Sequence, residues 1–141
     1  MFDTLVVDPE LVRATRALFA DGHHARAVEE SMKVLNHRVR DRSGLDLDGK
    51  PLMETAFSVN NPRLKLNDLK TQSQRNQQVG YMSILAGCMN GIRNPRAHEH
   101  QIVDSPRSAL QILCFVDHLL QTVNEATPTS ADAFVSTETS G

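Results

Sequence analysis

The chain has 141 residues and a formal net charge of −2 at pH 7, and 40% of its residues are hydrophobic but only 4% aromatic. This length fits one domain with a real core. The lack of Trp and of alternating β-branched runs favours packed helices over a sheet. The net charge alone predicts no nucleic-acid partner. No apolar run approaches the length that spans a bilayer, and the N-terminus lacks a basic region followed by an apolar core. We therefore expect a cytoplasmic protein that makes no membrane contact.

The first half of the chain predicts two helices and a shorter third one. Asp8 can cap a helix that starts at Pro9 and ends before Gly22. Apolar residues at helical spacing predict a longer helix over residues 23–44, closed by a glycine. After a turn, a short helix should follow Pro51.

The second half predicts an ordered loop and two more helices. Residues 58–75 show no sustained period and should form the loop. A helix over residues 74–94 should end or kink just before Pro95, because proline disfavours the helical conformation of the preceding residue. The last helix should cover residues 105–125, with Ser105 as its cap.

The two cysteines, Cys88 and Cys114, lie in apolar helical stretches, which predicts buried free thiols rather than a disulfide framework. Residues 126–141 are small and polar and predict a disordered tail. Together these features predict an all-α bundle of four to five helices that forms a single domain over residues 1–125.

Basic residues concentrate in the middle of the chain. The segment from residue 63 to residue 98 holds six Lys or Arg residues and one acidic residue, a local net charge of +5. Such a surface attracts polyanions whatever the total charge. The alternative is a solvated face whose charges pair with acids elsewhere in the fold. If the segment binds RNA, Lys65, Lys70 and Arg75 are candidate phosphate contacts.

The sequence GIRNPRAHEH, residues 91–100, places two arginines and two histidines at the predicted helix break. On an unbroken helix Arg93 and His98 point in different directions, since each residue turns by about 100°, but a kink at Pro95 could bring them towards one cleft. An arginine, the carboxamide of Asn94 and a histidine without a carboxylate partner suggest phosphate chemistry. The guanidinium is a fixed fork of donors for phosphate oxygens, and imidazole exchanges a proton near neutral pH.

The stretch from Arg93 to His98 resembles the Arg-x4-6-His signature of the HEPN superfamily (higher eukaryotes and prokaryotes nucleotide-binding domain). The stretches PLMETAFS, NPRLKLND and QQVGYMSILAGCMNGIRNPRAHEH together resemble the C-terminal domain of the Ymh-like family of uncharacterised bacterial proteins. This resemblance covers most of the chain, and members of that family are placed with HEPN proteins.

The resemblance implies a dimeric helical bundle in which the two motifs face each other in a shared cleft. It also implies a metal-independent endoribonuclease of a toxin–antitoxin or phage-defence system, with a possible antitoxin or defence-system partner and no cofactor. Arg93 and His98 would be the catalytic pair, and Asn94 holds the polar position after the arginine. Arg96 and His100 fall outside the minimal signature and are secondary candidates for RNA binding. Many HEPN toxins that a nucleotidyltransferase controls carry a Tyr where this chain has His100.

RNA suits this motif better than DNA, because the ribose 2′-OH is a nucleophile already held beside its phosphate. His98 could transfer the proton, and Arg93 could stabilise the charge that develops on phosphorus oxygens. Two apolar surfaces predict the dimer: the glycine-rich face of the helix over residues 79–93 and the broad apolar face of the last helix. Together they exceed what one small bundle must bury.

Other interpretations stay open. Arg93 and Asn94 could satisfy helix-end carbonyls while the histidines lie on the surface. A metal site built from His98, Glu99 and His100 is disfavoured, since no Cys or further His stands at ligand spacing, and no metal is expected. A HEPN-fold dimer could also bind RNA, a nucleotide or a partner protein without cleaving it.

Overall fold

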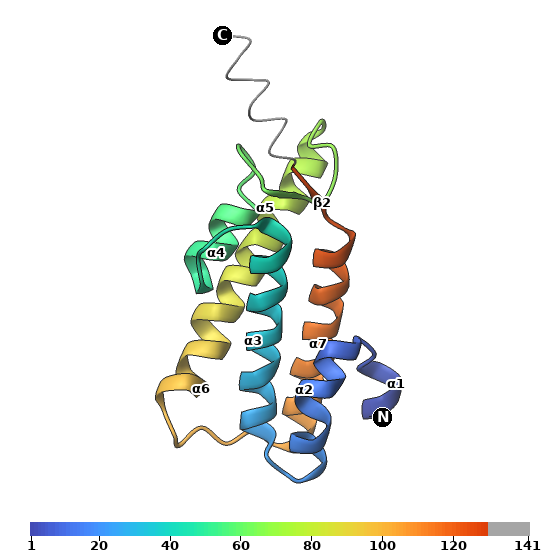
Figure 1. Ribbon diagram of the computed structural model, residues 1–141, viewed down its shortest axis with the longest axis vertical. Coiled ribbons are helices and arrows are strands. Elements are labelled where there is room, and N and C mark those ends of the chain that lie inside the picture. The colour runs from blue at the N-terminus through green and yellow to red at the C-terminus, as the bar shows by residue number, and fades with distance from the viewer. Residues whose placement is uncertain (130–141) are drawn as a thin grey trace.

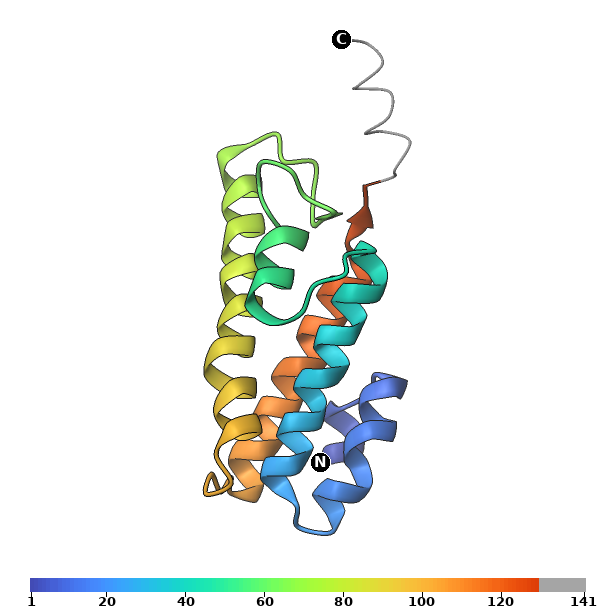
Figure 2. The ribbon, with the colours of Figure 1, turned by 60° about the vertical axis from the view of Figure 1, so that its left-hand side comes forward.

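The computed structural model describes residues 1–129 and is an all-α bundle (Figure 1), which confirms the predicted all-α class. It has more than the four to five helices predicted, because a short helix at Phe2–Leu5 was not predicted. In chain order the helices of these residues are α1 (Phe2–Leu5), α2 (Pro9–Ala20), α3 (His24–Ser43), α4 (Gly49–Ala56), α5 (Gln72–Gly87), the π-helix η1 (Cys88–Arg93), α6 (Asn94–His98) and α7 (Pro106–Glu125). Helix α3 packs on α2 and α7, and Figure 2 shows α5 on the opposite side of the α3–α7 pair from α2.

The capping residues lie where the sequence predicted helix ends. The side chain of Asp8 accepts a hydrogen bond from the backbone N–H of Leu11 (3.1 Å), and that of Ser105 accepts one from Ser108 (3.1 Å). Each satisfies one of the N–H groups that a first helical turn leaves unpaired. Gly44 follows α3 in the left-handed conformation, with φ +71°.

The apolar face of α7 is buried within this one chain. Leu113, Val116, Leu119, Leu120 and Val123 are fully buried in the core that α7 shares with the rest of the bundle. This face was predicted to be surplus apolar surface, which is wrong, because the bundle covers it. Of the two apolar surfaces that predicted a dimer, only the glycine-rich face of α5 and η1 is left.

The loop before α5 is built around one buried carboxamide. Nε2 of Gln78 donates to the carbonyl oxygens of Phe57 (3.2 Å) and Leu64 (2.9 Å), while its Oε1 accepts from the N–H of Leu66 (3.0 Å). A buried polar side chain is stable only when such partners satisfy it. The loop is therefore ordered, as its sequence predicted.

Residues 126–129 belong to the fold rather than to a tail. The short strands β1 (Leu64–Lys65) and β2 (Thr127–Pro128) pair in antiparallel fashion, and Ala126 is buried. The rest of the predicted disordered tail, residues 130–141, lies outside the described residues.

The helix that carries the motif does not end before Pro95. Asn94 keeps helical torsions (φ −61°, ψ −46°), and α5, η1 and α6 follow one another without interruption to His98. Proline lacks an N–H and its ring collides with the carbonyl four residues earlier in a regular α-helix. The chain accommodates it by widening the preceding turn into a π-helix, in which the N–H of Asn94 bonds to the carbonyl of Met89. Of the two predicted outcomes at this point, an end or a kink, the end of the helix is wrong.

Both cysteines are free thiols, as predicted, although only Cys88 is fully buried and Cys114 is half-buried. Burial raises the pKa of the Cys88 thiol to about 11 and also raises the pKa of Cys114. Both thiols are therefore protonated, and unreactive, at neutral pH. Within residues 1–129, no helix combines the length and the apolar character needed to cross a bilayer.

Candidate active site

Arg93, the last residue of the π-helix, extends its guanidinium towards the start of α4. Its Nη1 donates to Oδ1 of Asn36 on α3 (3.4 Å), and its Nε donates to Oδ1 of Asn94 (3.4 Å). A Cβ added to Gly49 would lie 3.1 Å from Nη2 of Arg93. The half-buried guanidinium therefore sits where α3, α4 and η1 meet.

The partners of Arg93 are carboxamides rather than carboxylates. Arg38, Arg40 and Arg96 each form an ion pair with at least one Asp or Glu. Among the ion pairs of residues 1–129, none involves Arg93. Neutral partners orient the guanidinium but do not cancel its charge, which stays available for an anion. The sequence motif had likewise suggested an arginine that has no carboxylate partner.

Asn36 connects Arg93 with the loop that leads into α4. Its Oδ1 also accepts the N–H of Gly49 (2.8 Å), and its Nδ2 donates to Oδ1 of Asp48 (2.9 Å). Gly49 is buried with φ +67°, a conformation that favours glycine. Neither Asn36 nor Gly49 was predicted from the sequence as a site residue. The glycine of DLDG could have signalled a turn with positive φ, but Asn36 carries no local signal.

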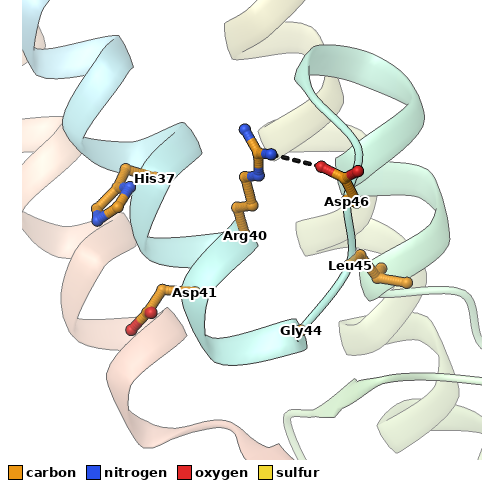
Figure 3. A pocket seen from close by; sticks show the side chains of 6 residues that line it. All are labelled: His37, Arg40, Asp41, Gly44, Leu45 and Asp46. Atoms are coloured by element: carbon orange, nitrogen blue, oxygen red, sulfur yellow. Dashed lines mark hydrogen bonds and ion pairs between the residues drawn. The ribbon is translucent and has the colours of Figure 1, made fainter.

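An open hollow of about 410 Å³ lies beside this loop at the end of α3 (Figure 3). Arg40 extends across it to Asp46, while His37 and Asp41 project from the same helix on the other side. Arg40 also donates to Oδ1 of Asp48 (3.5 Å). The acids of this loop are thus paired with Arg40 and Asn36, and they do not contact Arg93 directly.

The structure does not bring Arg93 and His98 together within the chain. Because α6 continues the helical path, the two residues are separated by about 140° around the axis and about 7.5 Å along it. His98 is exposed, and no hydrogen bond within the described residues involves its ring. The convergence that the sequence analysis expected from a kink at Pro95 is absent, because the helix passes that residue.

Arg96 forms a nearly buried ion pair instead of presenting a free guanidinium. Its Nε and Nη2 donate to the two carboxylate oxygens of Asp104 (2.9 and 2.6 Å), and its Nη1 donates to the carbonyl of Ile92 (3.0 Å). The side chains of Arg96 and Asp104 are only 13% and 6% exposed. Arg96 therefore fixes the loop between α6 and α7. The other secondary candidate, His100, is exposed in that same loop.

The three other predicted RNA contacts lie in and just before the first turn of α5, far from Arg93. Lys65 and Lys70 are exposed near the start of α5, and Nη1 of Arg75 donates to the carbonyls of Leu69 and Lys70. At 1.5 Å per residue, Arg75 is about 27 Å from Arg93 along the helix, and Figure 2 shows the start of α5 and α6 at opposite ends of the bundle. The basic segment therefore forms two separate groups rather than one patch.

In the part of the chain that the structure describes, no cluster of three or more His, Cys, Asp or Glu residues could hold a metal ion. A protein-family model described as "Protein of unknown function (Hypoth_ymh)" matches residues 6–123, and the chain belongs to this family. No curated protein and no solved structure matches the chain significantly. The matched region contains Asn36, Gly49 and the whole stretch from Arg93 to His98.

Proposed function

We propose that this member of the Hypoth_ymh family is a metal-independent endoribonuclease that cuts single-stranded RNA with Arg93, Asn94 and His98. The observation that carries the proposal is the environment of Arg93, a half-buried guanidinium that two carboxamides orient and that forms an ion pair with no acid among the described residues. The likeness of the motif to the HEPN signature supports the reaction class and a role as a toxin or phage-defence effector, with an antitoxin or another defence component as partner.

In the proposed reaction the ribose 2′-OH attacks the adjacent phosphorus, and the bond from phosphorus to the 5′ oxygen breaks. Arg93 holds the non-bridging oxygens as they gain negative charge. Asn94 keeps the guanidinium in place through its contact with Nε. His98, an exposed imidazole, takes the proton from the 2′-OH or gives one to the leaving 5′ oxygen.

The proposed site needs a second subunit, because Arg93 and His98 diverge on one helix. The exposed face of α5 and η1 supports this assembly. A Cβ added at Gly80, Gly87 or Gly91 would meet nothing within 4 Å, and Val79 and Ile84 are each 40% exposed. A second helix could approach this face closely. The face ends at the motif, so a two-fold dimer built on it would place both motifs in one cleft.

The same divergence favours a second candidate function. If no second subunit brings an arginine next to His98, Arg93 still presents its charged fork of donors to a phosphate, while His98 has no reacting group beside it. The protein would then bind RNA or a nucleotide without cutting it.

The deciding experiment incubates the purified protein with single-stranded RNA in EDTA. We expect products with 2′,3′-cyclic phosphate and 5′-hydroxyl ends. His98→Ala should lose about a hundredfold to ten-thousandfold in rate while still binding RNA. His23→Ala, a change of an exposed histidine at the turn between α2 and α3, is the matched control and should keep full activity.

Two further results separate the candidates. RNA with a 2′-deoxyribose at the scissile nucleotide should bind and resist cleavage, and Arg93→Lys should be severely impaired because an ammonium group lacks the bidentate fork. Cleavage of the deoxy substrate, or cleavage that requires magnesium, contradicts the mechanism. Tight RNA binding with no cleavage under any condition would establish the binding function instead.

A further inference from the structure

We infer that Asn36 is a positioning residue for Arg93, an inference that rests on the proposed function of that arginine in binding phosphate. No motif includes Asn36, which lies on α3, 57 residues before Arg93 in the chain. Its contacts show how the bundle can hold a guanidinium in place and leave its charge uncancelled.

The orientation of the Asn36 carboxamide is set by its neighbours. The backbone N–H of Gly49 can only donate, so the atom 2.8 Å from it must be the oxygen. The carboxylate of Asp48, when ionised, can only accept, so the atom 2.9 Å from it must be the nitrogen. The oxygen that receives the Gly49 N–H is therefore the atom that faces Nη1 of Arg93.

The carboxamide also separates two opposite charges. Asp48 is held on the nitrogen side of Asn36 and is shared with Arg40, whereas Arg93 is held on the oxygen side. An Asp at position 36 would have nearly the same shape but would put a carboxylate against Arg93. That ion pair would compete with a phosphate for the same fork of donors. A shorter side chain would leave the charge but would free the guanidinium to move.

These two effects can be measured separately at Arg93 itself. The Nε–H signal of Arg93 in an NMR spectrum, assigned by its loss in Arg93→Lys, is followed as inorganic phosphate is added. Asn36→Asp should weaken the phosphate response about tenfold or more, because the new carboxylate occupies the guanidinium. Asn36→Ala should retain phosphate binding within a few-fold.

The rate of RNA cleavage tests whether Asn36 orients the guanidinium of Arg93. With RNA at saturation, both variants should cut about tenfold to a hundredfold more slowly, since a misplacement of about 1 Å has effects of that size. Binding of RNA, measured in the His98→Ala background, should fall for Asn36→Asp but not for Asn36→Ala. Asn124→Asp is the matched control, because Oδ1 of Asn124 on α7 accepts a hydrogen bond from Nη1 of Arg38 on α3 (2.9 Å). It makes the same chemical change beside another arginine and should alter neither readout.

The outcomes distinguish this inference from the nuclease proposal. If Asn36→Asp weakens the phosphate response of Arg93 but the wild type cuts no RNA, the positioning role stands and the nuclease proposal fails. If the wild type cuts RNA and both Asn36 variants keep its cleavage rate and phosphate affinity, the positioning role is overturned. If Asn36→Asp does not fold, Asn36→Ala decides, and an unchanged saturated cleavage rate in that variant overturns the inference.

Discussion

Replacing Gly49 by Ala should damage the Arg93 site far more than it damages the fold. Gly49 has φ +67°, and a Cβ there would lie 3.1 Å from Nη2 of Arg93. Carbon and nitrogen atoms at that distance are in repulsive contact, so either the guanidinium or the start of α4 must shift by a few tenths of an ångström. The guanidinium is the end of a flexible side chain, and we expect it to move.

The cost to stability can be separated from the cost to the site. An L-residue with positive φ is strained by about 1–2 kcal/mol, which lowers the Tm of a domain of this size by a few degrees. Gly44 provides the matched control, since it has φ +71° and a Cβ there would meet nothing within 4 Å. Gly44→Ala should therefore lose the same stability and leave Arg93 where it is.

The assay compares the two alanine variants in urea denaturation and in RNA cleavage. Both should unfold at similarly lower urea concentrations, but only Gly49→Ala should lose cleavage, by about tenfold or more. The NMR signal of the Arg93 Nε–H should shift in Gly49→Ala alone. Equal activities in the two variants would refute the placement of Arg93 against α4. A much larger loss of stability in Gly49→Ala would show that the backbone moves instead of the guanidinium.

Changing Lys65, Lys70 and Arg75 together to Ala should weaken RNA binding and reduce its dependence on log salt by about 2 units; unchanged affinity and slope would identify a merely solvated face. Light scattering at high micromolar concentration should show a dimer, and a monomer there contradicts the shared cleft. Asp104→Ala should destabilise the fold by about 3–5 kcal/mol, because the guanidinium of Arg96 then stays nearly buried without a partner. In urea denaturation, a loss below about 1 kcal/mol would mean that the pair behaves like an exposed one.

Local chemistry made much of the fold predictable. Asp8, Gly44 and Ser105 mark helix ends through hydrogen bonds or torsions that involve only neighbouring residues, and the structure has each of them in that role. Pro95 failed as a signal because the rule for proline assumes a regular α-helix. The wider turn of the π-helix removes the collision between the proline ring and the carbonyl, and nothing in the adjacent sequence predicts that turn. The predicted disordered tail began a few residues too early, because β2 depends on pairing with β1, more than sixty residues away.

The candidate site likewise contains some residues that the sequence could identify and others that it could not. Arg93, Asn94 and His98 could be named from the sequence because they are close together in it, although their relation in space was predicted wrongly. Asn36 and Gly49 could not be named, since their contacts with Arg93 depend on how α3 and α4 pack on η1. The prediction that the basic segment forms a single patch was wrong for the opposite reason. Residues that are close in the sequence lie at both ends of a long helix.

The position of Arg93 on its helix explains why its environment points to a bound anion. Leu85 and Met89 are fully buried and lie eight and four residues before it, so Arg93 occupies the next place on the same inward stripe. An apolar residue would stabilise such a place, whereas a half-buried guanidinium loses hydration and needs partners. Arg96, three residues later, has that need met by Asp104. Within residues 1–129, the guanidinium of Arg93 donates only to the oxygens of Asn36 and Asn94, which fix its geometry and leave its charge uncancelled. A phosphate oxygen would supply the missing counter-charge.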